Sequence, residues 1–134
     1  MPLVANFLDT NILVYAFSEG PKAEVAQALM AEPFVLSVQA LNEFANIGRK
    51  KLKLSWERIE EAIDDLSSVA SAIVVLDKQA TKAALKLVGR YNLAFYDALM
   101  LAAALKANCG RYYSEDLQHG LLIDGKLTVI NPFR

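Results

Sequence analysis

The fold is decided by the stretch LVANFLDTN, which spans residues 3–11. Its first part is mostly apolar and predicts a short buried strand over residues 3–8. A carboxylate, a hydroxyl and an amide follow this strand directly, at Asp9, Thr10 and Asn11. In open α/β sheets, ligands bind beyond the carboxyl ends of the strands. Asp9 is therefore the first candidate for a functional residue.

The composition is typical of one folded domain: of 134 residues, 54% are hydrophobic and 22% are charged. We expect a single domain over residues 1–134, long enough to bury a core. No apolar run reaches the roughly 18 residues of a membrane span, and the first residues lack the features of a secretory signal. The single cysteine, Cys109, excludes a disulfide within the chain and a cysteine-type zinc site. These features predict a cytoplasmic protein without membrane contact.

Strand and helix patterns alternate along the rest of the chain. Short apolar runs predict further strands at residues 34–36, 73–76, 111–113 and 127–130. Residues with helical spacing predict helices at about 12–17, 21–32, 38–50, 56–70, 78–90 and 98–106. This alternation predicts an α/β fold, with a mostly parallel sheet of four to five strands covered by helices on both faces.

Four acids fall at or near strand ends and helix starts: Asp9, Glu43, Asp97 and Asp116. Parallel strands end at the same edge of a sheet, so these carboxylates are candidates for one shared pocket. Two of them at 4 Å repel by about 1 kcal/mol in water and by about 4 kcal/mol at an effective dielectric of 20. Such a cluster is stable only if it is protonated or holds a cation, and all-oxygen ligation suits Mg²⁺ or Mn²⁺. These metals orient water and stabilise charge in phosphoryl transfer.

Each acid also has a purely structural interpretation. Asp97 could cap its helix, and Asp9 and Asp116 could be turn residues. Glu43 fits a solvent-exposed helix face, because other polar residues share its side of the helix. His119, the only histidine, is interpreted as a turn residue and not as a general base. The functional interpretation therefore depends on the joint placement of the four acids.

Four blocks of the sequence resemble the acidic motifs of PIN-domain ribonucleases, in particular the VapC-like toxins of prokaryotic toxin–antitoxin pairs. The blocks are LDTNIL at 8–13, NEF at 42–44, YDAL at 96–99 and SEDLQHG at 114–120, and NPF at 131–133 is similar as well. The resemblance implies a PIN-like three-layer fold with strand order 3-2-1-4-5. It also implies an endoribonuclease that hydrolyses RNA phosphodiester bonds with Mg²⁺ or Mn²⁺, usually as a homodimer inhibited by a small antitoxin.

The same resemblance implies a role for each residue in these blocks. Metal binding and catalysis fall to the four acids, Asp9, Glu43, Asp97 and Asp116. Supporting hydrogen bonds come from three neighbouring polar residues, Thr10, Asn11 and Ser114. Glu115 is an additional acid beside Asp116, and its strand position predicts that it points away from the site.

Two groups of basic residues are candidates for holding RNA, although the formal net charge is −1. The predicted helix over residues 38–50 ends in a basic cluster of Arg49, Lys50, Lys51 and Lys53. Lys82 and Lys86 lie four residues apart on another helix, where like charges cost a few tenths of a kcal/mol. An RNA backbone or an acidic partner would relieve that repulsion, and an ordinary solvated lysine face is the alternative.

Two other functions are compatible with the same residues. One is a non-catalytic module on this fold that binds RNA or a protein partner, with the acids in structural roles. The other is a PIN nuclease outside any toxin pair, which acts on DNA or in RNA processing.

Overall fold

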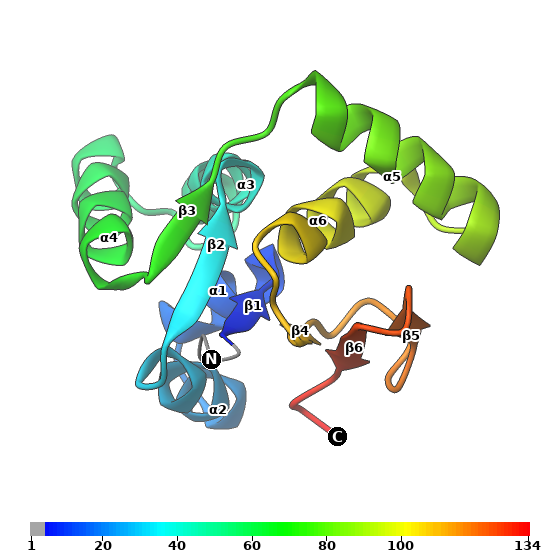
Figure 1. The fold of residues 1–134 in the computed structure, drawn as a ribbon. Helices are drawn as coiled ribbons and strands as arrows, with labels where there is room; N and C mark the ends of the chain where they lie inside the picture. The colour runs from blue at the N-terminus through cyan, green and yellow to red at the C-terminus, as the bar shows by residue number, and fades with distance from the viewer. Residues whose placement is uncertain (1–4) are drawn as a thin grey trace.

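One sheet of six strands forms the centre of the computed structural model, which describes residues 5–134 (Figure 1). The strands are β1 (Asn6–Leu8), β2 (Phe34–Ser37), β3 (Ala72–Val74), β4 (Arg111–Tyr113), β5 (Leu122–Ile123) and β6 (Leu127–Ile130). They lie in the order β3-β2-β1-β4-β6-β5, and only the β5–β6 pair is antiparallel. Two residues of the predicted first strand, Leu3 and Val4, lie outside the described residues.

The predicted α/β class is confirmed, and so is the mostly parallel sheet. The expected order 3-2-1-4-5 recurs as β3-β2-β1-β4-β6, but the expected count of four to five strands is too low. The additional strand, β5, has two residues and pairs with β6 through a tight hairpin. Asp124 and Gly125 in that hairpin have φ angles of 51° and 67°. A strand this short carries no recognisable hydrophobic alternation, so the sequence pattern does not reveal it.

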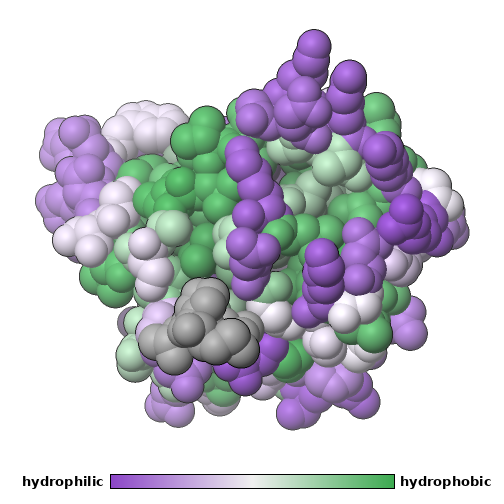
Figure 2. Space-filling model, in the orientation of Figure 1, coloured by the Kyte–Doolittle hydropathy of each residue, from purple (hydrophilic) through white to green (hydrophobic). Residues whose placement is uncertain are grey.

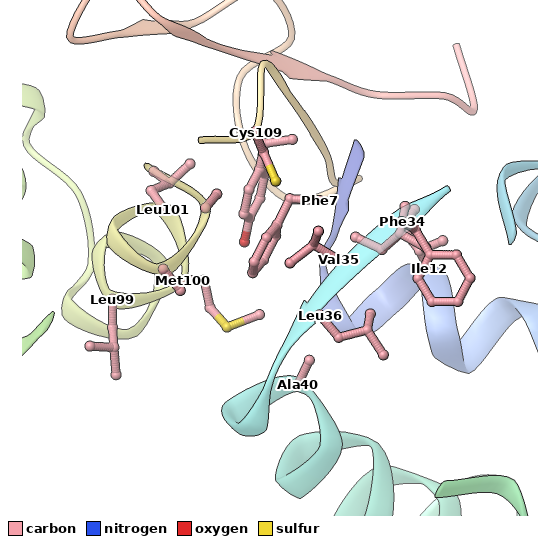
Figure 3. Packing of buried hydrophobic residues seen from close by; sticks show 14 of the residues in the cluster. Phe7, Ile12, Phe34, Val35, Leu36, Ala40, Leu99, Met100, Leu101 and Cys109 are labelled. Carbon is pink, nitrogen blue, oxygen red and sulfur yellow. The ribbon is translucent and has the colours of Figure 1, made fainter. Parts of the chain in front are cut away.

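Helices cover both faces of the sheet. They are α1 (Thr10–Ala16), α2 (Pro21–Met30), α3 (Val38–Lys50), α4 (Trp56–Val69), α5 (Lys78–Tyr91) and α6 (Phe95–Lys106). Figure 1 shows α5 and α6 packed together, apart from the group formed by α1, α2, α3 and α4. In Figure 3, α6 and α1 lie on opposite sides of β2, which gives the expected three layers.

The core has two halves, because successive side chains of a strand point to opposite faces. Figure 3 shows Phe34 and Leu36 on the side of α1, whereas Val35 faces α6. Phe7 of β1 is in register with Val35 and lies on the same side. Between Ala98 and Ala104, every residue of α6 is buried, as its uniformly apolar sequence predicts.

Short connections fix the polar residues at one sheet edge. β1 and β2 are parallel neighbours, and each runs straight into a helix. The N-cap of α1 is Asp9, and the N-cap of α3 is Ser37. Since β4 also runs parallel to β1, the residues that follow it reach the same edge. Within residues 5–134, no helix combines the length and the apolar character needed to cross a membrane.

Candidate active site

The four predicted acids line a single cavity of about 570 Å³. They come from four different places in the fold: the end of β1, the middle of α3, the first turn of α6 and the turn after β4. The residues are Asp9, Glu43, Asp97 and Asp116. Acids up to 107 positions apart in the sequence therefore meet at the sheet edge, as their joint placement predicts.

Asp9 is held on both carboxylate oxygens. Its Oδ1 accepts a hydrogen bond of 2.7 Å from the backbone N–H of Thr10, and its Oδ2 accepts one of 2.7 Å from Ser114 Oγ. Only 7% of the residue is exposed. Burial raises the pKa of Asp9 to about 6, with a smaller contribution from the charges of Asp116 and Asp97, and the two hydrogen bonds oppose this rise.

Glu43 is half-buried and does not lie on a freely solvated face. Thr10 Oγ1 donates a hydrogen bond of 2.5 Å to Glu43 Oε1, which connects the first turn of α1 to α3. A hydrogen bond from a hydroxyl to a carboxylate is short and strong because the acceptor is charged. Thr10 therefore orients two acids: Asp9 through its backbone and Glu43 through its side chain.

Asp116 is positioned by Asn11 and Ser114. Asn11 Nδ2 donates to Asp116 Oδ2 at 3.0 Å, and the N–H of Asp116 donates to Ser114 Oγ at 3.1 Å. Ser114 itself is fully buried and donates to Asp9, so one hydroxyl links the two acids. The geometry thus agrees with supporting roles for Asn11 and Ser114.

Asp97 is the third residue of α6 and does not cap this helix. The N-cap is Ala94, and no side chain closes this helix end. The capping interpretation of Asp97 is therefore wrong. Burial raises the pKa of Asp97, with further contributions from the negative charges of Asp116 and Glu43. Asp97 thus lines the same cavity as the other three acids.

A protein family matches the region of the chain that contains the four acids. The family model described as the PIN domain matches residues 7–118, most of the chain. The chain belongs to the PIN-domain family. No curated protein matches the sequence.

The PIN-domain protein also shares its fold with solved structures. A chain of a toxin–antitoxin complex from Klebsiella pneumoniae is 26% identical, with a TM-score of 0.72 over 96% of this chain and 98% of that one. Mycobacterium tuberculosis VapC20, described as a sarcin–ricin loop cleaving toxin, is 17% identical, with a TM-score of 0.67 over 81% and 87%. Rickettsia felis VapBC2, bound to a promoter DNA fragment, is 21% identical, with a TM-score of 0.61 over 84% and 88%. The predicted VapC-like PIN fold is thereby confirmed.

The donor set of the PIN-domain site fits a hard divalent cation, because the four acids offer only oxygen atoms. Burial and mutual repulsion raise the pKa values of Asp9 and Asp97, and a cation would relieve both costs of ionisation. Within residues 5–134, however, no three acidic, histidine or cysteine side chains lie close enough together to hold a metal ion as they stand. The acids share a cavity without forming a closed ligand set.

Glu115 lies in the wall of the same cavity. The expectation that it points away from the site stays a prediction, because lining the cavity does not fix the direction of its carboxylate. Its carboxylate is engaged by two partners: Lys22 Nζ lies 2.6 Å from Oε2, and Tyr15 OH donates to Oε1 at 2.7 Å. The hydrogen bonds from Lys22 and Tyr15 lower the pKa of Glu115. Lys22 offsets this fifth negative charge.

Of the predicted basic residues, Lys51 lines the acidic cavity, whereas Arg49, Lys50, Lys82 and Lys86 lie outside it. Arg49 donates to the carbonyl of Leu54 at 3.1 Å and stacks on Trp56 at 5.1 Å, and Lys50 is exposed. On α5, Lys82 and Lys86 line a separate hollow. Figure 2 shows hydrophilic side chains gathered along this helix.

The cavity wall includes three further polar residues, Tyr15, Asn46 and Lys51. Sequence reasoning missed Tyr15. It placed Asn46 on the same polar helix face as Glu43, and Lys51 in the basic cluster at the end of that helix. In the structure, Lys51 is the C-cap of α3. His119 accepts a hydrogen bond of 3.0 Å from the N–H of Asn131, in agreement with a turn role.

Proposed function

We propose that this PIN-domain protein is a metal-dependent endoribonuclease that acts as the toxin of a toxin–antitoxin pair. The observation that carries the proposal is the convergence of Asp9, Glu43, Asp97 and Asp116 in one cavity. The 26%-identical relative comes from a toxin–antitoxin complex, which supports the biological role. The relative described as a sarcin–ricin loop cleaving toxin has the same fold, which supports RNA as the substrate.

Asp9, Glu43, Asp97 and Asp116 would hold Mg²⁺ or Mn²⁺ in this cavity. When bound, such an ion activates water for attack on a phosphodiester and stabilises charge on its oxygens. Ser114 and the Thr10 N–H keep the Asp9 carboxylate in one orientation, and Thr10 Oγ1 does the same for Glu43. Such fixed orientations lower the cost of assembling the site around substrate.

Lys51 contributes positive charge to the wall of the cavity, where a phosphate backbone would approach the acids. The exposed residues Arg49, Lys50, Lys82 and Lys86 are proposed as further contacts to RNA or to an acidic antitoxin segment. We also propose a homodimer, a single domain over residues 1–134 and a cytoplasmic location, where cellular RNA is accessible.

Cleavage of RNA by the purified protein tests the catalytic proposal. With Mn²⁺ we expect hydrolysis of a total RNA substrate by the wild type and no cleavage with EDTA. Asp97→Asn should lower the rate at least a hundredfold while the circular dichroism spectrum stays the same. Asp65→Asn, which changes an exposed acid on α4, serves as the matched control and should retain the wild-type rate.

Full cleavage by Asp97→Asn would contradict the assigned role of the acids. RNA binding without cleavage by the wild type would instead support the non-catalytic module. The toxin role has its own readout: expression should arrest bacterial growth, and Asp97→Asn should restore it.

A further inference from the structure

Tyr112 in the middle of β4 is a buried polar side chain that the proposed mechanism does not use. The residue is 0% exposed, and its hydroxyl has no hydrogen-bond partner among the described residues. The phenol groups of buried tyrosines usually have a partner, because an unsatisfied buried hydroxyl is costly. No other buried side-chain nitrogen or oxygen in residues 5–134 lacks a partner in this way. The position of this hydroxyl therefore requires an explanation.

The ring of Tyr112 has little freedom to turn away. It stacks on Phe7 with the ring centroids 5.3 Å apart and an angle of 11° between the planes. Phe7 and Tyr112 are also direct neighbours in the register of β1 and β4. The stacked pair belongs to the face of the sheet that α6 covers, since Phe7 lies on that face (Figure 3).

Tyr112 and Asp9 belong to the same face of two neighbouring strands. Phe7 pairs with Tyr112, and the N–H of Asp9 donates to the Tyr113 carbonyl at 3.0 Å, so the pairing of β1 with β4 continues as far as Asp9. Because successive side chains alternate between faces, Asp9 falls on the face of Phe7, and Ser114 falls on the face of Tyr112 and donates to Asp9 at 2.7 Å. Burial raises the pKa of Tyr112, and the charge of Asp9 raises it further. Asp9 is therefore the acceptor that we consider for the unpartnered hydroxyl.

Asp9 has acceptor capacity left for this donor. An ionised carboxylate offers about four lone-pair sites. The Thr10 N–H and Ser114 Oγ occupy one on each oxygen. One remaining site can accept from Tyr112 on the buried side, and another stays available on the side of the cavity.

We propose that Tyr112 is a positioning residue for the acidic site, whose hydroxyl donates a hydrogen bond to Asp9 when the cavity holds a divalent cation. This proposal rests on the proposed metal-dependent function. A cation on the cavity side and the Tyr112 hydroxyl on the buried side would hold the same carboxylate in one orientation, so each interaction favours the other. Three donors would then fix Asp9 from the protein side: Tyr112, Ser114 and the Thr10 N–H.

Mn²⁺ binding without RNA tests this role, with Tyr112→Phe as the variant. The substitution removes one oxygen atom and keeps the stacked ring. We expect the Mn²⁺ concentration that gives half of the thermal stabilisation to rise about tenfold, the loss expected of one hydrogen bond to a charged group. Tyr113→Phe is the matched control, because Tyr113 is the next residue of the same strand and faces the other side. It should bind Mn²⁺ like the wild type.

The opposite result is equally clear. A higher melting temperature of Tyr112→Phe in EDTA, together with unchanged Mn²⁺ binding, would overturn the proposal. It would show that the hydroxyl is buried without a partner and does not act in metal binding. A wild-type protein that does not respond to Mn²⁺ would overturn the metal site and this proposal together. Normal binding by the wild type with no change in Tyr112→Phe overturns only the role of Tyr112.

Discussion

Asp9 combines two roles that act on its pKa in opposite directions. As the N-cap of α1 and the acceptor from Ser114, it gains hydrogen bonds that favour the ionised form. As a buried acid facing Asp116 and Asp97, it is pushed towards the protonated form, and the net result is a pKa of about 6. The ionised site is therefore under electrostatic stress at neutral pH.

This stress predicts an unusual dependence of stability on pH. Between pH 4 and pH 6 the folded protein binds a proton on Asp9 that the unfolded chain releases, so the free energy of unfolding falls as pH rises through this window. The pKa of Asp9 is raised from 3.8 to about 6, which corresponds to a decrease of at most about 3 kcal/mol in the free energy of unfolding. Urea denaturation in EDTA from pH 4 to pH 8 measures this decrease in the free energy of unfolding. Asp9→Asn should remove most of the decrease and be the more stable protein at pH 7.5.

Asp77→Asn provides the comparison for this experiment. Asp77 also caps a helix, but it is exposed, and its hydrogen bond from the N–H of Ala80 lowers its pKa. Its contribution to stability is lost as pH falls below 4, outside the window of Asp9. Parallel pH profiles for the wild type and Asp9→Asn would contradict the raised pKa.

At the residue scale, the role of a side chain can be predicted when it lies in a recognisable motif. It cannot be predicted when it depends on partners that are far away in the sequence. Thr10, Asn11 and Ser114 lie in the blocks that resemble PIN-domain motifs, and this resemblance implies their supporting roles. The ion pair of Glu115 could not be predicted, because its partner Lys22 lies 93 positions away. The lack of a partner for the Tyr112 hydroxyl could likewise not be predicted, because it depends on which residues surround the ring in the folded chain.

The N-terminal end of α3 links this helix to α6, and both helices supply acids to the site. α3 carries Glu43, and its N-cap Ser37 accepts a hydrogen bond of 3.1 Å from the N–H of Ala40. Ser37 is fully buried, and its hydroxyl also lies 3.0 Å from Met100 Sδ on α6. A single side chain thus joins the two helices that supply Glu43 and Asp97.

Ser37→Ala should therefore affect both stability and metal binding. Loss of an N-cap costs about 1 kcal/mol, and we expect a decrease of this size in the free energy of unfolding. We also expect weaker Mn²⁺ binding, because the start of α3 becomes less well fixed relative to α6. Urea denaturation and calorimetric titration with Mn²⁺ measure the two effects.

Ser55→Ala separates the two effects. Ser55 caps α4 by accepting a hydrogen bond of 3.0 Å from the N–H of Arg58, and α4 supplies no residue to the cavity. A similar loss of stability with unchanged Mn²⁺ binding is expected. If both variants bind Mn²⁺ equally well, the start of α3 does not control the site.

At the element scale, long periodic segments were predictable and very short ones were not. The helices are found where their apolar spacing predicts them, and Ser37, Ser55 and Asp77 cap the expected helices. Only the strand β5 was missed. Its two residues are determined by pairing with β6 and by the hairpin, which are interactions of the folded chain and not of a local pattern.

Across the whole molecule, most of the basic residues proposed to contact RNA lie away from the acidic cavity. Lys51 is the basic residue at the cavity wall, while Lys82 and Lys86 lie along α5. The double charge reversal Lys82→Glu and Lys86→Glu should weaken RNA or antitoxin binding and make RNA binding less sensitive to salt, because phosphate contacts release counterions. Fluorescence anisotropy at several salt concentrations measures this effect. Lys126→Glu, an exposed change on the β5–β6 hairpin, is the control, and unchanged binding by the double variant would indicate a merely solvated face.

The convergence of the four acids follows from topology, which the alternation of strands and helices makes predictable. Their final spacing does not follow, because it depends on side-chain orientation and on the ion that they are proposed to share. The most direct measurement is an anomalous difference map from a crystal soaked in MnCl₂. We expect one or more Mn²⁺ peaks in the cavity, about 2.1 Å from carboxylate oxygens of Asp9 and its neighbouring acids. Absence of a peak there at millimolar Mn²⁺, or peaks only elsewhere, would contradict a shared metal site.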